Sequence, residues 1–67
     1  MTKGKAVPID VYDKAGEMLR IEFYDGSGEF ILQCLWDESE DQTSENRIAF
    51  RKWAYQWMSD RNWVVPR

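Results

Sequence analysis

Apolar residues recur with helical spacing along residues 47–63, RIAFRKWAYQWMSDRNW. At about 100° per residue, a single face of this segment collects four of them. They are Phe50, Trp53, Ala54 and Trp57. Polar side chains such as Lys52 fall on the opposite face. The pattern therefore predicts an amphipathic helix whose apolar stripe packs on a core.

The ends of this helix are predicted from capping residues. We expect it to begin between Gln42 and Asn46, with Thr43 or Ser44 as the N-cap, because short hydroxyl side chains satisfy the free backbone N–H groups of a first turn. It should end within residues 60–62. Residues 63–65 can then form a short last strand or an extended tail on the core.

Three segments before the helix alternate apolar and polar residues with a period of two, which predicts strands over 7–12, 17–24 and 29–36. The polar turns 13–16 and 25–28 that separate them are short, so consecutive strands should pair antiparallel. The predicted fold class is α+β, with a three-stranded antiparallel β-meander packed against one C-terminal helix. Residues 1–67 form one domain, in which residues 1–5 fray and 37–44 form an acidic loop.

The predicted core lies between the sheet and the helix. Its members are Leu19, Ile21, Phe23, Phe30, Leu32, Trp36, Phe50, Trp53 and Trp57. The same alternation assigns a set of more polar side chains to the outer face of the sheet. These are Asp10, Tyr12, Arg20, Glu22, Tyr24 and Gln33. A chain this short needs a dense core, and its ten aromatic residues supply the bulk.

Several classes of site are disfavoured by composition. The single cysteine, Cys34, rules out an internal disulfide, and the absence of histidine removes the usual zinc ligands and the usual general base near pH 7. Cys34 lies in an apolar run, so we expect a small buried hydrophobe. We predict no enzymatic activity, no cofactor and no metal. The N-terminal ten residues lack the apolar region of a signal peptide, and no run of apolar residues is long enough to span a membrane, so a cytoplasmic location is expected.

Two loops resemble ligand-binding motifs and are better explained as ordinary loops. The segment 25–28, DGSG, joins two strands, whereas phosphate-binding glycine loops lead into a helix. Residues 37–48 match a calcium loop at the first, third and fifth positions. Gln42 replaces the required glycine and Ile48 the required bidentate acid, which excludes an EF-hand.

Charge is distributed unevenly along the chain. Residues 1–45 carry four basic and eleven acidic residues, a net charge of −7, whereas residues 46–67 carry five basic and one acidic residue, a net charge of +4. The two parts can neutralise each other within the fold. Alternatively, the acidic part forms a surface for a basic partner.

The order of three strands and a basic helix, over residues 7–60, is similar in outline to the arm-binding DNA domains of phage integrases. That resemblance implies a nucleic-acid-binding module whose outer sheet face meets the DNA. Here the outer face would present Asp10 and Glu22, and carboxylates oppose binding to phosphate.

The function predicted from these features is non-enzymatic binding of another protein, one with a basic surface. Small acidic, aromatic-rich chains without catalytic residues are common among accessory and inhibitor proteins of phages and mobile elements. The alternatives are a nucleic-acid-binding module that uses the basic helix, and an acidic mimic of DNA. Neither membrane binding nor a particular oligomeric state is predicted.

We expect the partner to bind a second flank of the helix, which is apolar beyond the main stripe and also carries arginines. Its residues are Arg47, Ile48, Arg51, Tyr55 and Met58. An aromatic residue next to arginines is typical of interface hot spots. The acidic rim of the site would be Asp37, Glu38, Glu40 and Asp41. In the alternative interpretation, residues 63–65 or the sheet edge cover this flank, and the partner site moves to the outer sheet face around Tyr12, Tyr24 and Leu35.

Overall fold

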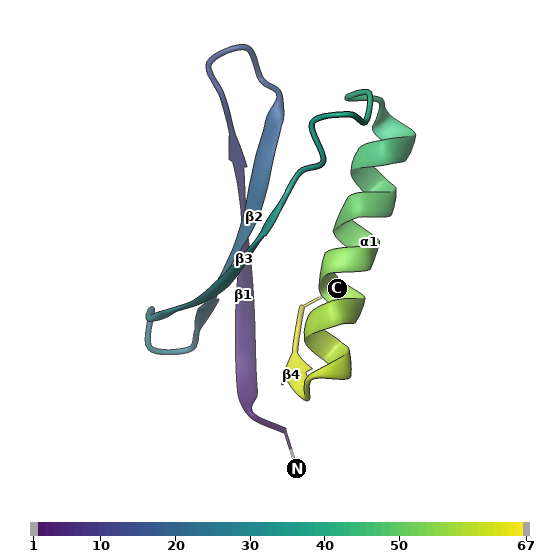
Figure 1. The fold of residues 1–67 in the computed structure, drawn as a ribbon. Coiled ribbons are helices and arrows are strands. Elements are labelled where there is room, and N and C mark those ends of the chain that lie inside the picture. Colours follow the sequence, from purple (N-terminus) through teal and green to yellow (C-terminus); the bar gives the residue numbers. More distant parts are fainter. Residues whose placement is uncertain (1, 67) are drawn as a thin grey trace.

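The computed structural model describes residues 2–66, in which four strands and one helix follow in the order predicted (Figure 1). The elements are β1 (Gly4–Tyr12), β2 (Met18–Asp25), β3 (Phe30–Leu35), α1 (Ser44–Asp60) and β4 (Trp63–Val64). The α+β class is therefore confirmed, as are the meander, the helix that follows it and the short last strand.

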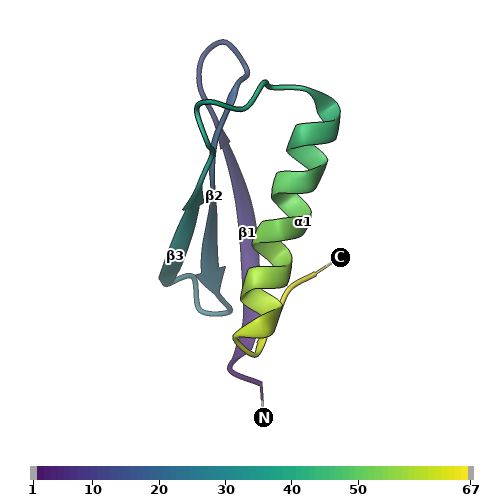
Figure 2. The ribbon, with the colours of Figure 1, turned by 45° about the vertical axis from the view of Figure 1, so that its right-hand side comes forward.

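The sheet has the strand order β3-β2-β1-β4, and α1 lies across one of its faces (Figure 2). Strands β1, β2 and β3 are antiparallel to their neighbours, whereas β4 pairs parallel with the start of β1. The prediction that residues 1–5 fray is wrong for the part that the structure describes. Gly4 and Lys5 pair with β4, and the Lys3 N–H donates to the carbonyl of Asn62 at 2.7 Å. Residue 1 lies outside the described residues.

The helix ends agree with the predicted capping. Thr43 is the N-cap, and its Oγ1 accepts a hydrogen bond from the Asn46 N–H at 3.1 Å. At the other end Arg61 is the C-cap, and Asn62 follows with φ of 68°. Asparagine tolerates this left-handed conformation better than most residues, so the chain can reverse there and enter β4.

Two irregularities in strand pairing change which side chains face the helix. The β1–β2 register skips Leu19, so Met18 is buried while Leu19 is 43% exposed. The β2–β3 register skips Ile31, so Phe30 pairs with Tyr24 on the outer face and is 54% exposed. Leu19 and Phe30 were predicted in the core, and both predictions are wrong because a bulge breaks the period of two.

The side chains of β1 also lie on the opposite faces of the sheet from those predicted. Pro8 pairs with the buried Phe23, so Pro8 and Asp10 point toward the helix. Val7 and Ile9 consequently point away from it and are 38% and 47% exposed. Tyr12 pairs with the buried Met18, and its hydroxyl donates to Asp10 Oδ2 at 3.3 Å. The prediction that Asp10 and Tyr12 lie on the outer face is therefore wrong, and the outer face is more apolar than expected.

The helix is rotated relative to the predicted stripe. Its fully buried residues are Ala54 and Met58, whereas Trp53 is 55% exposed and Phe50 and Trp57 are half-buried. The buried core of the described residues consists of Ala6, Met18, Ile21, Phe23, Cys34, Trp36, Ala54 and Met58. Cys34 is buried as predicted. Trp53 was predicted in this core, but the rotation of α1 carries it past the sheet into solvent.

Candidate functional site

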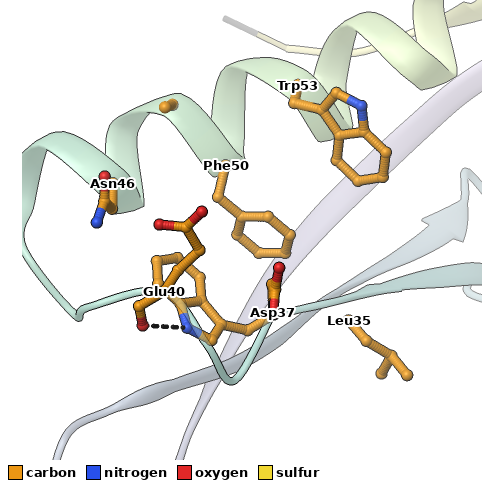
Figure 3. A pocket seen from close by; sticks show the side chains of 8 residues that line it. Leu35, Asp37, Glu40, Asn46, Phe50 and Trp53 are labelled. Carbon is orange, nitrogen blue, oxygen red and sulfur yellow. Dashed lines mark hydrogen bonds between the residues drawn. The ribbon is translucent and has the colours of Figure 1, made fainter.

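A groove opens between the end of β3, the loop that follows it and the first half of α1 (Figure 3). Its volume is about 470 Å³. The residues that line it are Leu35, Trp36, Asp37, Glu40, Asn46, Ala49, Phe50 and Trp53. We call this feature the aromatic groove. It combines a wall of large rings with two carboxylates at its mouth.

The rings of the groove form a continuous series from the core to the surface. Trp36 is buried and meets Phe50 edge to face, with 5.2 Å between ring centroids and an interplanar angle of 79°. Phe50 in turn lies nearly parallel to Trp53, with 6.3 Å between centroids and an angle of 19°. The buried Trp36 holds Phe50 in place, and the half-exposed Trp53 presents aromatic surface to a ligand.

Two carboxylates lie beside these rings (Figure 3). Asp37 Oδ1 accepts hydrogen bonds from the Ser39 N–H at 3.0 Å and from Ser39 Oγ at 2.7 Å. The hydrogen bond from the Ser39 hydroxyl is the main reason that the pKa of Asp37 lies below its ordinary value. Trp36 holds the backbone at Glu40, because the Trp36 Nε1–H donates a hydrogen bond to the Glu40 carbonyl at 3.3 Å. Asp37 therefore stays ionised at neutral pH, at a defined place on the groove.

A second hollow of about 490 Å³ adjoins the aromatic groove and shares Trp36 and Glu40 with it. It is lined by acids from two parts of the chain, the β1–β2 turn and the loop after β3. They are Asp13, Glu17, Glu38, Glu40 and Asp41. Together with Asp37 they make six carboxylates at one end of the molecule. We call these six residues the acidic surface.

Gln42 joins the two segments that carry the acidic surface. Its Oε1 accepts a hydrogen bond from the Met18 N–H at 2.9 Å, and its Nε2 donates to the Met18 carbonyl at 3.0 Å. Arg47 adds a hydrogen bond from Nε to Gln42 Oε1 at 3.2 Å and one from Nη2 to the Gly16 carbonyl at 3.3 Å. The loop before α1 is thus attached to the β1–β2 turn, which keeps the acids of both segments side by side.

The flank predicted to bind the partner is largely used within the fold. Met58 is fully buried, so its predicted role as a contact residue is wrong: α1 turns this side chain onto the sheet. Tyr55 is half-buried and packs edge to face on Phe23, with 6.1 Å between centroids. Arg51 forms an ion pair with Asp10, and Ile48 is 50% exposed. Met58 and Tyr55 agree with the alternative interpretation, because the sheet covers the part of the flank that they form.

A smaller set of the predicted flank remains accessible. A hollow of about 440 Å³ is lined by Ile48, Arg51, Lys52, Tyr55 and Gln56. The four predicted acidic-rim residues do not line this hollow and lie instead at the two hollows described above. The rim therefore borders Trp36, Phe50 and Trp53, rings that were predicted only as core. The one signal of this in the sequence is the adjacency of Trp36 to the acidic run that begins at Asp37.

Residues 2–66 offer no sign of a metal centre or a membrane-spanning helix. In that part of the chain no three His, Cys, Asp or Glu side chains gather as metal ligands. The only helix there, α1, is not long and apolar enough to cross a membrane. Comparison of the sequence with protein-family models and curated proteins, and of the fold with solved structures, finds no match.

Proposed function

We propose that this protein binds a basic segment of a partner protein in the aromatic groove, and that it has no catalytic activity of its own. The observation that carries the proposal is the placement of the half-exposed Trp53 and of Phe50 beside the carboxylates of Asp37 and Glu40. A cation that enters the groove would meet aromatic faces and negative charge together.

An arginine side chain fits this combination best. A guanidinium group stacks on an indole face, an interaction of about 0.5–2 kcal/mol, and it can donate paired hydrogen bonds to a carboxylate. A lysine ammonium is more strongly hydrated and lacks the planar surface. We therefore expect the groove to prefer arginine over lysine.

The acidic surface would assist binding from a greater distance. Six carboxylates at one end of a chain with a net charge of −3 produce a directional field, which accelerates association with a basic partner and weakens as salt rises. The proposal includes a cytoplasmic location and an accessory or inhibitory role of the kind found among phage proteins.

A DNA mimic is a narrower form of the same proposal. One observation favours it. Asp13 and Glu17, from the β1–β2 turn, line the same hollow as the acids of the loop, which makes the acidic surface larger. The partner would then be a protein whose basic surface binds DNA. DNA binding by α1 is less favoured, because Arg51 is paired with Asp10 and Arg61 lies over the Trp57 ring, 3.1 Å from its centroid.

The test is titration of the isotope-labelled protein with a short peptide of alternating arginine and glycine, followed by NMR. The indole N–H signals of Trp36 and Trp53 should shift, whereas that of Trp63, at the other end of α1, should not. A peptide with glutamate in place of arginine should produce no shifts, and one with lysine should bind more weakly.

Variants separate the groove from general attraction by charge. Asp37→Asn with Glu40→Gln removes two charges from the groove, and the matched control, Glu29→Gln with Asp60→Asn, removes two charges elsewhere on the surface. The first pair should lower affinity at least tenfold and the control by much less. Equal losses in both pairs would contradict a defined site, and shifts confined to residues of α1 away from the groove would place binding on another surface.

A further inference from the structure

The outer face of the sheet is an uncovered apolar surface. Helix α1 lies on the opposite face (Figure 2), and Val7, Ile9 and Phe30 on this one are 38%, 47% and 54% exposed. Their positions follow from the reversed facing of β1 and from the bulge in β3. One face of an antiparallel sheet can be wet, but it is then mostly polar. An apolar face of this kind marks an interaction surface.

The charged groups at the centre of this face balance each other. On the central strand β2, Arg20 Nε donates to Glu22 Oε2 at 2.8 Å, and Tyr24 donates from its hydroxyl to Glu22 Oε1 at 2.9 Å. The centre therefore carries one positive and one negative charge, without the excess of either sign found on the acidic surface. A strongly basic or acidic partner gains no net attraction there.

We propose that the outer face of the sheet binds the same face of a second copy of this chain, forming a two-fold symmetric dimer. A two-fold interface uses the same surface of both copies, so each contact between two different residues occurs twice, once in each direction. With the axis between Arg20 and Glu22, the arginine of each copy lies over the glutamate of the other. The apolar side chains of β1 and β3 then surround two matched ion pairs.

The size of the protein supports the same conclusion. Only eight apolar residues are buried in the described part of the chain, and domains of fewer than about 70 residues commonly gain stability by association. The face is three strands wide, about 14 Å, and up to nine residues long, about 30 Å. That is small for an interface, so the dimer should dissociate on dilution.

Light scattering coupled to size-exclusion chromatography tests the proposal over a concentration series. The mass should rise from 8.0 kDa toward twice that value, and Tm should rise with protein concentration. Ile9→Lys should abolish the increase in mass. Ile48→Lys is the matched control, because Ile48 is a similarly exposed isoleucine on α1, and it should still dimerise. A wild-type mass of 8.0 kDa at every concentration would overturn the proposal, as would a dimer that Ile48→Lys disrupts and Ile9→Lys does not.

A charge-exchange experiment keeps the proposal testable if Ile9→Lys unfolds the chain. Arg20→Glu makes the centre of the face doubly negative, and Glu22→Arg makes it doubly positive. Each variant alone should be monomeric, and an equimolar mixture should form a heterodimer. If both variants dimerise alone, or if the folded variants fail to associate when mixed, the face does not form the interface. Neither residue lines the aromatic groove, although Arg20 pairs with its lining residue Leu35, so peptide binding of each variant is measured separately.

Discussion

Arg51 donates a hydrogen bond from Nη2 to Oδ2 of Asp10 at 2.6 Å, which connects α1 to the helix-facing side of β1. The two residues are 41 positions apart, and their side chains are 37% and 25% exposed. The hydrogen bond to Asp10 is the main cause that raises the pKa of Arg51. This pair explains how the Asp10 carboxylate can lie on the inner face of β1, although the hydrophobic pattern placed it on the outer face.

The ion pair should make a modest contribution to stability. In a double-mutant cycle of Asp10→Asn and Arg51→Met, we expect a coupling free energy of about 0.5–1 kcal/mol, since the pair is partly open to solvent. Urea unfolding followed by circular dichroism measures it. Lys52→Met, on the exposed face of the same helix, should change the free energy of unfolding by less than about 0.5 kcal/mol. A coupling of zero would mean that packing alone orients Asp10 inward.

The rotation of α1 predicts losses of different size from two truncations on that helix. Met58→Ala removes a fully buried side chain and should lower the free energy of unfolding by about 2–5 kcal/mol. Trp53→Ala removes a larger side chain, but one that is 55% exposed, and should cost about 1 kcal/mol. Thermal melts of both variants provide the comparison. The reverse order of the two losses would mean that the helix has the orientation predicted from the sequence.

Gln42 should be more important to the fold than an exposed loop glutamine. Gln42→Ala removes two hydrogen bonds to the Met18 backbone and leaves those polar groups part-buried, at a cost of about 1–3 kcal/mol. Hydrogen exchange of the Met18 amide should accelerate in the variant. Gln56→Ala is the matched control, because Gln56 donates only to the exposed Asp60, and it should change stability by less than about 0.5 kcal/mol. Unchanged protection at Met18 would show that Gln42 does not hold the loop.

Asp25 should make stability depend on pH through the β2–β3 turn. Its Oδ1 accepts hydrogen bonds from the Ser27 hydroxyl at 2.7 Å and from the Ser27 and Glu29 N–H groups at 2.9 Å. The hydroxyl bond is the largest cause that lowers the pKa of Asp25, and the Glu29 N–H is the next. Because the folded pKa lies below the unfolded one, the contribution is fully present above about pH 4 and is lost as pH falls through the folded pKa.

The measurement is Tm as a function of pH for the parent and for Asp25→Asn. The parent should be more stable at pH 7, and the difference should shrink as pH falls below about 4. Ser27→Ala removes the hydroxyl donor and should produce a smaller difference of the same sign. A difference that persists unchanged to pH 2 would show that the charge of Asp25 is not what the turn requires.

The candidate site was predictable in part. The acidic rim followed from the composition of residues 37–45, but it was predicted beside the flank of Arg51 and Tyr55, whereas its residues line the aromatic groove and the second hollow. Its aromatic neighbours were not assigned to a site, because Trp53 and Phe50 have the spacing of core residues. Helical periodicity does not show how much of the apolar stripe the sheet covers. The predicted contact flank was wrong at Met58 for the same reason. Helical spacing does not show which side of the helix faces the sheet.

The sequence alone determined the order and type of the elements, the start of the helix within residues 42–46 and the antiparallel meander. These depend on local periodicity, capping and turn chemistry, which act over a few residues. Tertiary structure decided which faces are buried. Two bulges, at Leu19 and Ile31, shift side chains across the sheet, and the Asp10–Arg51 pair joins residues that are 41 positions apart. Strand register and helix rotation are set by the packing of one element on another, and that packing is not encoded in the pattern of either element alone.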